Sequence, residues 1–239
     1  MQSDAYLNFE SSVEELKSLI HLLMPTGVRQ SFSKLQRRVR RKLGKQSSID
    51  LGKAMSDFGD DVEDYIRGRQ ILQNRLSVML VAITESYVEE GLVSLATRDE
   101  SLPINIDGVS PKAILDAESL DVLKTDVRRQ WASKFLTGGP RQWLPSLRKL
   151  GAKGYEKDCD FRLQHLWDTR NIVVHSRGIV RPDYAKRYPS PPLKVGDPIK
   201  VGFSVFKWWL HGLENFVEVT DQMFVKRVST GSGSRARTK

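Results

Sequence analysis

Apolar residues recur every three or four positions along most of this sequence, and this spacing restricts the fold more than any other feature. Residues 69–97 carry the longest uninterrupted pattern, which predicts one long helix. Strand signals are short, at 179–180 and 199–201, and at most predict a short ribbon. Proline and glycine make 99–112 and 179–200 irregular. The sequence therefore predicts an all-α fold, with further helices at about 7–24, 28–43, 47–66, 112–137, 140–150, 156–177 and 202–227.

The positive charge of the chain is concentrated in two segments. Its 38 Lys and Arg residues exceed its 29 Asp and Glu residues by nine, yet residues 34–45 and 226–239 contain twelve basic residues and no acid. Without those twelve, 26 positive charges face 29 negative ones. Such segments are typical of surfaces that contact nucleic acid, although a solvated helix face and a solubilising tail would carry the same charge. The candidate RNA contacts are Arg37, Arg38, Arg40, Arg41 and Lys42.

Other sequence features exclude several classes of protein. One cysteine, Cys159, cannot form a disulfide framework or a thiolate zinc site. The four histidines are scattered, so we expect no metal and no cofactor. There is no apolar run long enough for a transmembrane helix and no signal-peptide pattern at the N-terminus. The sequence predicts a soluble, cytoplasmic protein without membrane contact.

Two charged residues fall inside apolar helix faces. On a helical wheel, Arg170 lies near the centre of a stripe formed by Leu163, Leu166, Trp167, Val173 and Val174. Glu85 has the same position among Val78, Val81, Ala82, Val88 and Leu92. Because an unpaired charge is costly to bury, the pattern predicts a Glu85–Arg170 ion pair between packed helices. The alternative is that each side chain extends along the surface into solvent.

Arg170 is followed by two further polar residues of chemical interest, Asn171 and His175. Their spacing of four places them on one edge of the same helix. Arginine binds phosphoryl oxygens with a permanent charge, and histidine can transfer a proton to or from a ribose hydroxyl. These three residues are the candidate catalytic set, with Glu85 in support. A lone histidine is also commonly structural, and that alternative remains open.

The stretch DTRNIVVHSRGIV, residues 168–180, resembles the signature of the HEPN superfamily, an arginine followed after a few positions by a histidine. Arg170, Asn171 and His175 match this motif with four intervening residues. The acidic-aromatic element at 85–87 precedes it, as in such domains. The stretch VGDPIKV at 195–201, followed by an aromatic-rich helix, is similar to the C-terminal part of the RiboL-PSP/MAE-like subgroup. The resemblance covers about residues 65–228.

This resemblance implies an all-helical ribonuclease domain that needs no metal and acts in bacterial defence or toxin–antitoxin systems. It further implies a homodimer whose two motif helices face each other across a cleft. One His175 cannot serve as base and acid at once, whereas two related by a twofold axis can. Arg170 would stabilise charge at phosphorus, and Asn171 would orient the phosphate or the imidazole. The expected partners are RNA, a second copy of the chain, and an antitoxin or defence protein.

The same resemblance sets the expected domain organisation. Residues 1–64 would be an N-terminal helical extension packed on the bundle, 65–228 the HEPN-like domain, and 229–239 a disordered basic tail. Two alternatives to catalysis remain. One is a non-catalytic RNA- or nucleotide-binding adaptor in a defence complex. The other is a partner-binding subunit in which Arg170 and Glu85 only stabilise packing.

Overall fold

The structure, a computed structural model, confirms that the chain is all-α. It describes residues 2–17, 51–99, 102, 104, 117–189 and 193–231, with side chains throughout these ranges except at 51–69, 72–73, 203 and 230–231. The expected basic helix at 28–43 and the candidate RNA contacts Arg37, Arg38, Arg40, Arg41 and Lys42 lie outside the described residues. The helices are an N-terminal segment (4–17), α2 (Leu51–Arg98), α4 (Leu120–Leu136), α5 (Pro140–Leu150), α6 (Cys159–His175), α7 (Pro182–Arg187) and α8 (Phe203–Gly231).

The helices differ from expectation in three regions of the chain. The helices predicted at 47–66 and 69–97 are one helix, α2, which at 48 residues is about 72 Å long. A single glycine at position 68 does not interrupt it, because one glycine costs a helix only about 1 kcal/mol. α2 therefore runs through the domain boundary expected at 64/65. A short helix, α7, lies inside the stretch expected to be irregular. α8 continues to Gly231, so the first residues of the expected tail are helical, while 232–239 lie outside the described residues.

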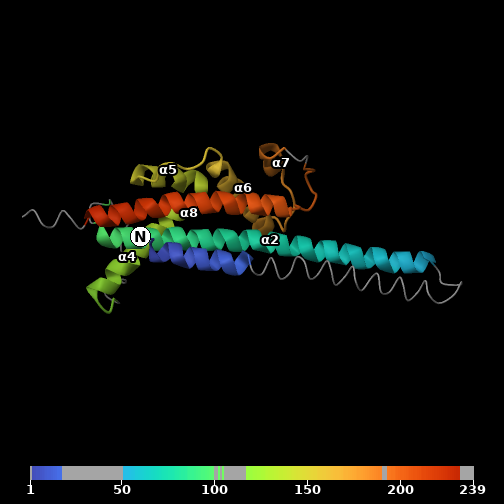
Figure 1. Cartoon of the computed structure of the whole chain (residues 1–239), viewed down its shortest axis with the longest axis horizontal. Coiled ribbons are helices and arrows are strands. Elements are labelled where there is room, and N and C mark those ends of the chain that lie inside the picture. Colours follow the sequence, from blue (N-terminus) through green and yellow to red (C-terminus); the bar gives the residue numbers. More distant parts are fainter. Residues whose placement is uncertain are drawn as a thin grey trace, which may run out of the picture.

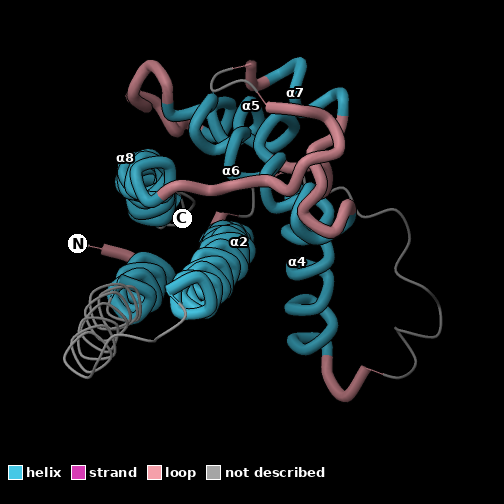
Figure 2. Tube along the Cα trace, turned by 90° about the vertical axis from the view of Figure 1, so that its right-hand side faces the viewer, coloured by secondary structure: helices cyan, strands magenta, loops and turns pink. Residues whose placement is uncertain are grey.

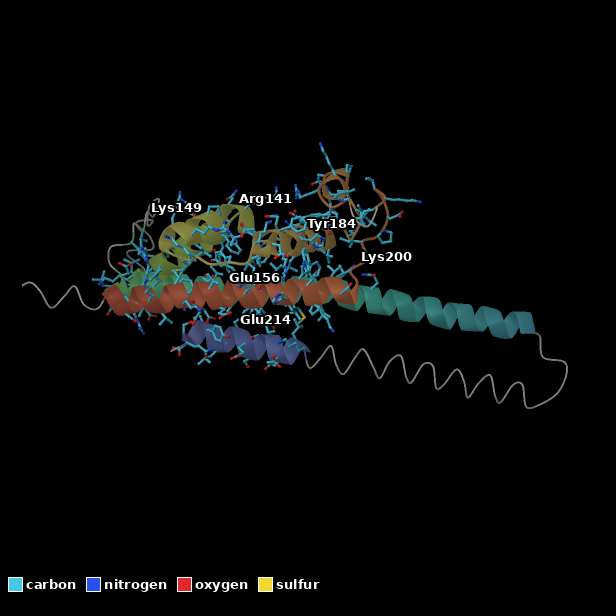
Figure 3. All side chains as sticks on the ribbon, turned by 45° about the horizontal axis from the view of Figure 1, so that its top comes forward. Arg141, Lys149, Glu156, Tyr184, Lys200 and Glu214 are labelled. Carbon is cyan, nitrogen blue, oxygen red and sulfur yellow. The ribbon has the colours of Figure 1, made fainter. Side chains whose placement is uncertain are left out.

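Two long helices, α2 and α8, form the centre of the molecule and run side by side in the same direction (Figure 1). The N-terminal segment and α6 flank this pair and run the opposite way. Figure 2 shows α2, α8 and the N-terminal segment end-on, with α4 crossing their direction. In Figure 3, α5, α6 and α7 form one layer above the ribbon of α8, and Glu214 lies between α8 and the N-terminal segment. There Lys17 pairs with Glu214 at 3.1 Å.

The core is aromatic and centres on Tyr87 of α2. Its ring contacts Phe9, Phe216 and Phe224, and its hydroxyl donates to the Val217 carbonyl at 3.1 Å. Burial raises the pKa of Tyr87 well above its usual value, so the hydroxyl stays protonated and remains a donor. A side chain at Gly91 would collide with the Phe224 ring, since an added Cβ would lie 2.2 Å from it. The absence of a side chain at 91 thus allows α2 and α8 to approach closely.

Burial on α2 corrects the predicted position of Glu85. The buried face follows Leu80, Thr84, Val88 and Leu92, so Thr84, not Glu85, occupies its centre, and Glu85 is only half-buried. Thr84 tolerates burial because its hydroxyl donates to the Leu80 carbonyl at 2.7 Å. The expected strand signals do pair as a minimal ribbon. Among the described residues, this is a single antiparallel bridge between Ile179 and Pro198.

The described helices include none with the combination of length and apolar character that crossing a membrane requires.

Candidate functional site

The predicted catalytic residues lie at the C-terminal end of α6, which stops at His175. The backbone turns sharply there: Arg177 takes a left-handed conformation (φ 53°) that is rare for a residue with a side chain. The Gly178 amide then donates to the Ile172 carbonyl at 2.9 Å, and Ile199 donates to the Gly178 carbonyl at 2.7 Å. This turn leaves His175 on the last turn of α6, exposed, with Asn171 one turn before it on the same edge.

An open pocket of about 350 Å³ borders this end of α6. Its other side is formed by residues 181–187, which we call the α7 wall. The pocket is lined by Asp168, Asn171, Ile172, His175 and Ser176 of the α6 end and by Arg181, Asp183, Tyr184 and Arg187 of the α7 wall. The structure therefore brings Asn171 and His175 into one pocket with charged groups that the sequence motif does not contain.

Arg170 does not line this pocket, but it contacts Asn171, which does. Its side chain is half-buried, and one terminal nitrogen donates to Asn171 Oδ1 at 3.1 Å. Because a guanidinium can only donate, the amide must present its oxygen to Arg170 and its NH₂ group elsewhere. The Arg170 Nε atom is buried without a hydrogen-bond partner, and Arg170 makes no ion pair within the described ranges. A half-buried charge without a counter-ion is therefore adjacent to the pocket.

The predicted Glu85–Arg170 ion pair is wrong. Neither residue pairs with the other in the part of the chain that the structure describes, although α2 and α6 pack against each other. The reason is rotational: both charges lie to the side of the buried faces rather than at their centres. On α6, Thr169 and Ile172 are buried instead, while Val174, predicted to be in the core, is 46% exposed. Glu85 is thus not brought to the candidate site.

Asp168 connects the pocket to the helices around it. Its carboxylate, whose side chain is only 13% exposed, accepts hydrogen bonds from Arg187, from Tyr188 at 2.7 Å and from Gln164 at 2.9 Å. Arg141 of α5 adds a contact at 3.6 Å; Figure 3 shows Arg141 and Tyr184 in the layer above α8. Burial and the Asp168 carboxylate both raise the pKa of Tyr188, so its hydroxyl remains a donor. Asp168 holds the α7 wall in place.

A half-buried histidine, His165, lies beneath the same wall. Trp209 donates its indole N–H to His165 Nδ1 at 2.9 Å, and Nε2 lies 3.5 Å from the Tyr184 hydroxyl, which bonds Thr169 at 2.7 Å. Since an indole can only donate, Nδ1 must carry a lone pair, and His165 is the neutral tautomer with its proton on Nε2. Burial lowers the pKa of His165 to about 4. The histidine therefore packs α6, α7 and α8 together and is not free to exchange protons at neutral pH.

This burial predicts that the protein loses stability in mild acid. In the unfolded chain a histidine titrates near pH 6.5, about 2.5 units above the folded pKa, so between these values the unfolded state binds more protons. The free energy of unfolding should fall as pH drops from about 6.5 to about 4, with His165 contributing a slope of up to about 1.4 kcal/mol per pH unit. Urea unfolding across this range would measure it. A His165→Gln variant, which gains no proton, should have a shallower slope, and an equal slope would contradict the assignment.

Of the residues predicted from the sequence, Asn171 and His175 line the pocket and Arg170 contacts Asn171, whereas the α7 wall was not predicted. Pro182 at the first turn of α7, within the segment RPDYAKRY, is a helix-start signal that could have revealed it. Within the described residues there is no group of three or more His, Cys, Asp or Glu side chains that could hold a metal ion.

The site therefore combines an exposed imidazole, an oriented amide, and arginines both behind and across the pocket. Comparison of the chain with protein-family models, with curated proteins and with solved structures found no match, and its function is therefore inferred from the residues that form this pocket.

Proposed function

We propose that the chain is an endoribonuclease that cleaves RNA without a metal, through attack of the ribose 2′-hydroxyl on the adjacent phosphate. One observation carries this proposal. Arg170, half-buried and without a carboxylate partner among the described residues, orients Asn171, which lines an open pocket with His175. A structural arginine in this position would be expected to pair with an acid, because an uncompensated charge costs stability. The positive charge of Arg170, which no described carboxylate neutralises, and the nearby exposed imidazole of His175 would favour the binding of a phosphate.

The residues divide the chemistry between them. The Asn171 NH₂ group, directed away from Arg170, can donate to a non-bridging phosphate oxygen. Arg170 behind it stabilises the negative charge that grows on the phosphoryl oxygens as phosphorus becomes five-coordinate. His175 is exposed at the pocket and can exchange protons with a ribose hydroxyl or a leaving oxygen. In this arrangement the arginine charge and the imidazole lie at the end of the same helix.

The reaction needs two proton transfers. A base removes the 2′-hydroxyl proton as that oxygen bonds to phosphorus, and an acid protonates the 5′-oxygen as its bond to phosphorus breaks. The products are a 2′,3′-cyclic phosphate and a 5′-hydroxyl. His165 cannot supply the second group, because it is bonded to Trp209, lies outside the pocket, and is about 15 Å from His175 along α6. The second imidazole would therefore come from His175 of a second copy.

The resemblance to HEPN domains supports the same function. The described chain is all-α, the arginine and histidine of the motif occupy the end of one helix, and a two-fold composite site is what such domains use. The resemblance also suggests a role in bacterial defence or in a toxin–antitoxin pair, with a partner protein that holds the activity in check.

The 2′-hydroxyl provides the sharpest test of this mechanism. In the presence of EDTA, the protein should cut an RNA oligonucleotide and leave 2′,3′-cyclic phosphate ends, identified by mass spectrometry. The same oligonucleotide with 2′-deoxyribose at each cleaved position should resist, because the nucleophile is gone while the phosphates are unchanged. Cleavage of the deoxy substrate, or cleavage only with a divalent ion, would contradict the proposal. RNA that binds but is never cut would instead favour a non-catalytic RNA-binding module.

A further inference from the structure

The α7 wall contains an arginine, Arg181, that the proposed reaction does not use. Arg181 Nε contacts Asp183 Oδ1 at 3.3 Å, and both side chains are 60% exposed. Ion pairs this exposed contribute little to stability and are readily exchanged for another partner. The Arg181 guanidinium forms no hydrogen bond with another described side chain, and its only ion pair there is the one with Asp183, so its two terminal nitrogens remain available as donors. They form a planar pair of donors beside the pocket.

Arg187, the other arginine of the wall, differs from Arg181. It is bound by Asp168, a largely buried carboxylate that also accepts hydrogen bonds from Tyr188 and Gln164. Such a guanidinium is fixed in place, and an anionic ligand would not displace its carboxylate partner. Of the two arginines of the wall that line the pocket, Arg181 is therefore the one that a ligand can recruit, and its exposed partner Asp183 is the group that the ligand would replace.

The α6 side of the pocket also offers donors to an anion, and its carboxylate, Asp168, is already paired with Arg187. Asn171 presents an NH₂ group and His175 an imidazole, so the rim offers donors from both α6 and the α7 wall. The volume of about 350 Å³ falls at the small end of the range for ligand sites. A pocket of this volume can hold a phosphate group and part of its sugar.

We propose that Arg181 binds a backbone phosphate of the RNA neighbouring the one that is cut, and that Asp183 acts as its displaceable counter-ion. This inference rests on the proposed ribonuclease function and specifies its substrate class. The substrate is an RNA strand that extends at least one nucleotide beyond the cleaved linkage, because a dinucleotide has no second phosphate for Arg181. Terminal nitrogens of arginine can bind two phosphate oxygens at once, which fixes the register of the strand without reading its sequence.

A binding experiment that needs no cleavage tests this subsite. The probe is a fluorescent RNA of roughly 12 nucleotides, 2′-O-methylated throughout so that it cannot be cut, with Kd followed by anisotropy over a series of salt concentrations. Arg181→Ala should raise Kd about tenfold, the effect of losing one charged hydrogen-bonding partner. It should also reduce the slope of log Kd against log salt by about 0.7, the change expected for one phosphate contact to a single strand.

Lys186→Ala is the matched control. Lys186 is an exposed cation of the same short helix, but it does not line the pocket. Its loss should change Kd by less than about twofold and leave the salt slope unchanged. Asp183→Asn should tighten binding, because it removes the carboxylate that competes with phosphate for Arg181. A merely structural role for the Arg181–Asp183 pair would not produce tighter binding.

Several results would overturn the subsite. One is a Kd for the probe that Arg181→Ala leaves unchanged, or that Arg181→Ala and Lys186→Ala raise equally. Another is an Asp183→Asn variant that binds the probe no more tightly than the wild type. The last is a wild-type chain that does not bind the probe. Failure of the ribonuclease proposal is seen separately, as uncut ordinary RNA, because the methylated probe reports binding alone.

Discussion

Replacing His175 by alanine should lower the rate of RNA cleavage at least a hundredfold. A positioned acid or base contributes about 10²- to 10⁴-fold to a proton-transfer reaction, and the pocket contains no second histidine of the same chain among the described residues. His175 is exposed at the end of α6, so its removal leaves the core intact. The rate is measured under single-turnover conditions in EDTA, and circular dichroism should show an unchanged helix content.

His211→Ala is the matched control for this substitution. His211 is also an exposed histidine, 59% exposed on α8, where it lies 3.5 Å from Glu156 and outside the pocket. Its loss should leave the cleavage rate unchanged. If the His175→Ala variant still cuts RNA at a rate near that of His211→Ala, the imidazole takes no part in the reaction and the proposed site is wrong.

A mixed dimer shows whether two copies share one site. Wild-type and His175→Ala chains carrying different tags are co-expressed, and the dimer with one of each is isolated through both tags. A site that draws on both imidazoles lacks one group in every mixed dimer, so cleavage should fall by far more than half. A rate close to half that of the wild type would mean that each copy works alone, which contradicts the composite site.

Most of the fold follows from the spacing of apolar residues, and the two misplaced charges share one physical cause. The predicted faces were drawn from apolar residues alone and so left out Thr84 and Thr169, which placed Glu85 and Arg170 at their centres. In the structure both threonines are buried, because their hydroxyls form hydrogen bonds inside the protein, to the Leu80 carbonyl and to Tyr184. A threonine satisfied in this way counts as apolar. With that correction, neither charge lies at the centre of a buried face, and no Glu85–Arg170 pair is required.

The site could be predicted only as far as it is local in sequence. Asn171 and His175 are one turn apart on α6, a relation that helical geometry alone provides. The α7 wall depends on the turn at Arg177 and Gly178 and on the hydrogen bonds that join 178–180 to 196–199. Those contacts are set by backbone pairing across an intervening stretch, which has no periodic signal. The α6 side of the pocket could therefore be predicted from the sequence, whereas the α7 wall could not.

The interaction with the largest expected effect on stability is that of Asp168. We expect Asp168→Ala to lower the free energy of unfolding by about 2 kcal/mol, chiefly because the buried Tyr188 hydroxyl loses its acceptor. The substitution also leaves Arg187 without its carboxylate, but the Arg187 side chain is 35% exposed, so solvent screens part of that loss. Urea unfolding followed by circular dichroism measures the loss.

The control is Asp160→Ala, which removes the partner of Arg148 in an ion pair whose two side chains are 42% and 46% exposed. That change should cost less than about 1 kcal/mol, because solvent screens an exposed pair. Equal losses in the two variants would show that Asp168 contributes no more than a surface charge. If Asp168 helps to fix the α7 wall, its loss should loosen the position of Arg181 relative to His175. Asp168→Ala should then weaken RNA binding at temperatures where the protein is still fully folded, whereas Asp160→Ala should not. Stability and substrate binding would then both depend on the Asp168 carboxylate, which forms the ion pair between α6 and the α7 wall, beside the Thr169–Tyr184 hydrogen bond.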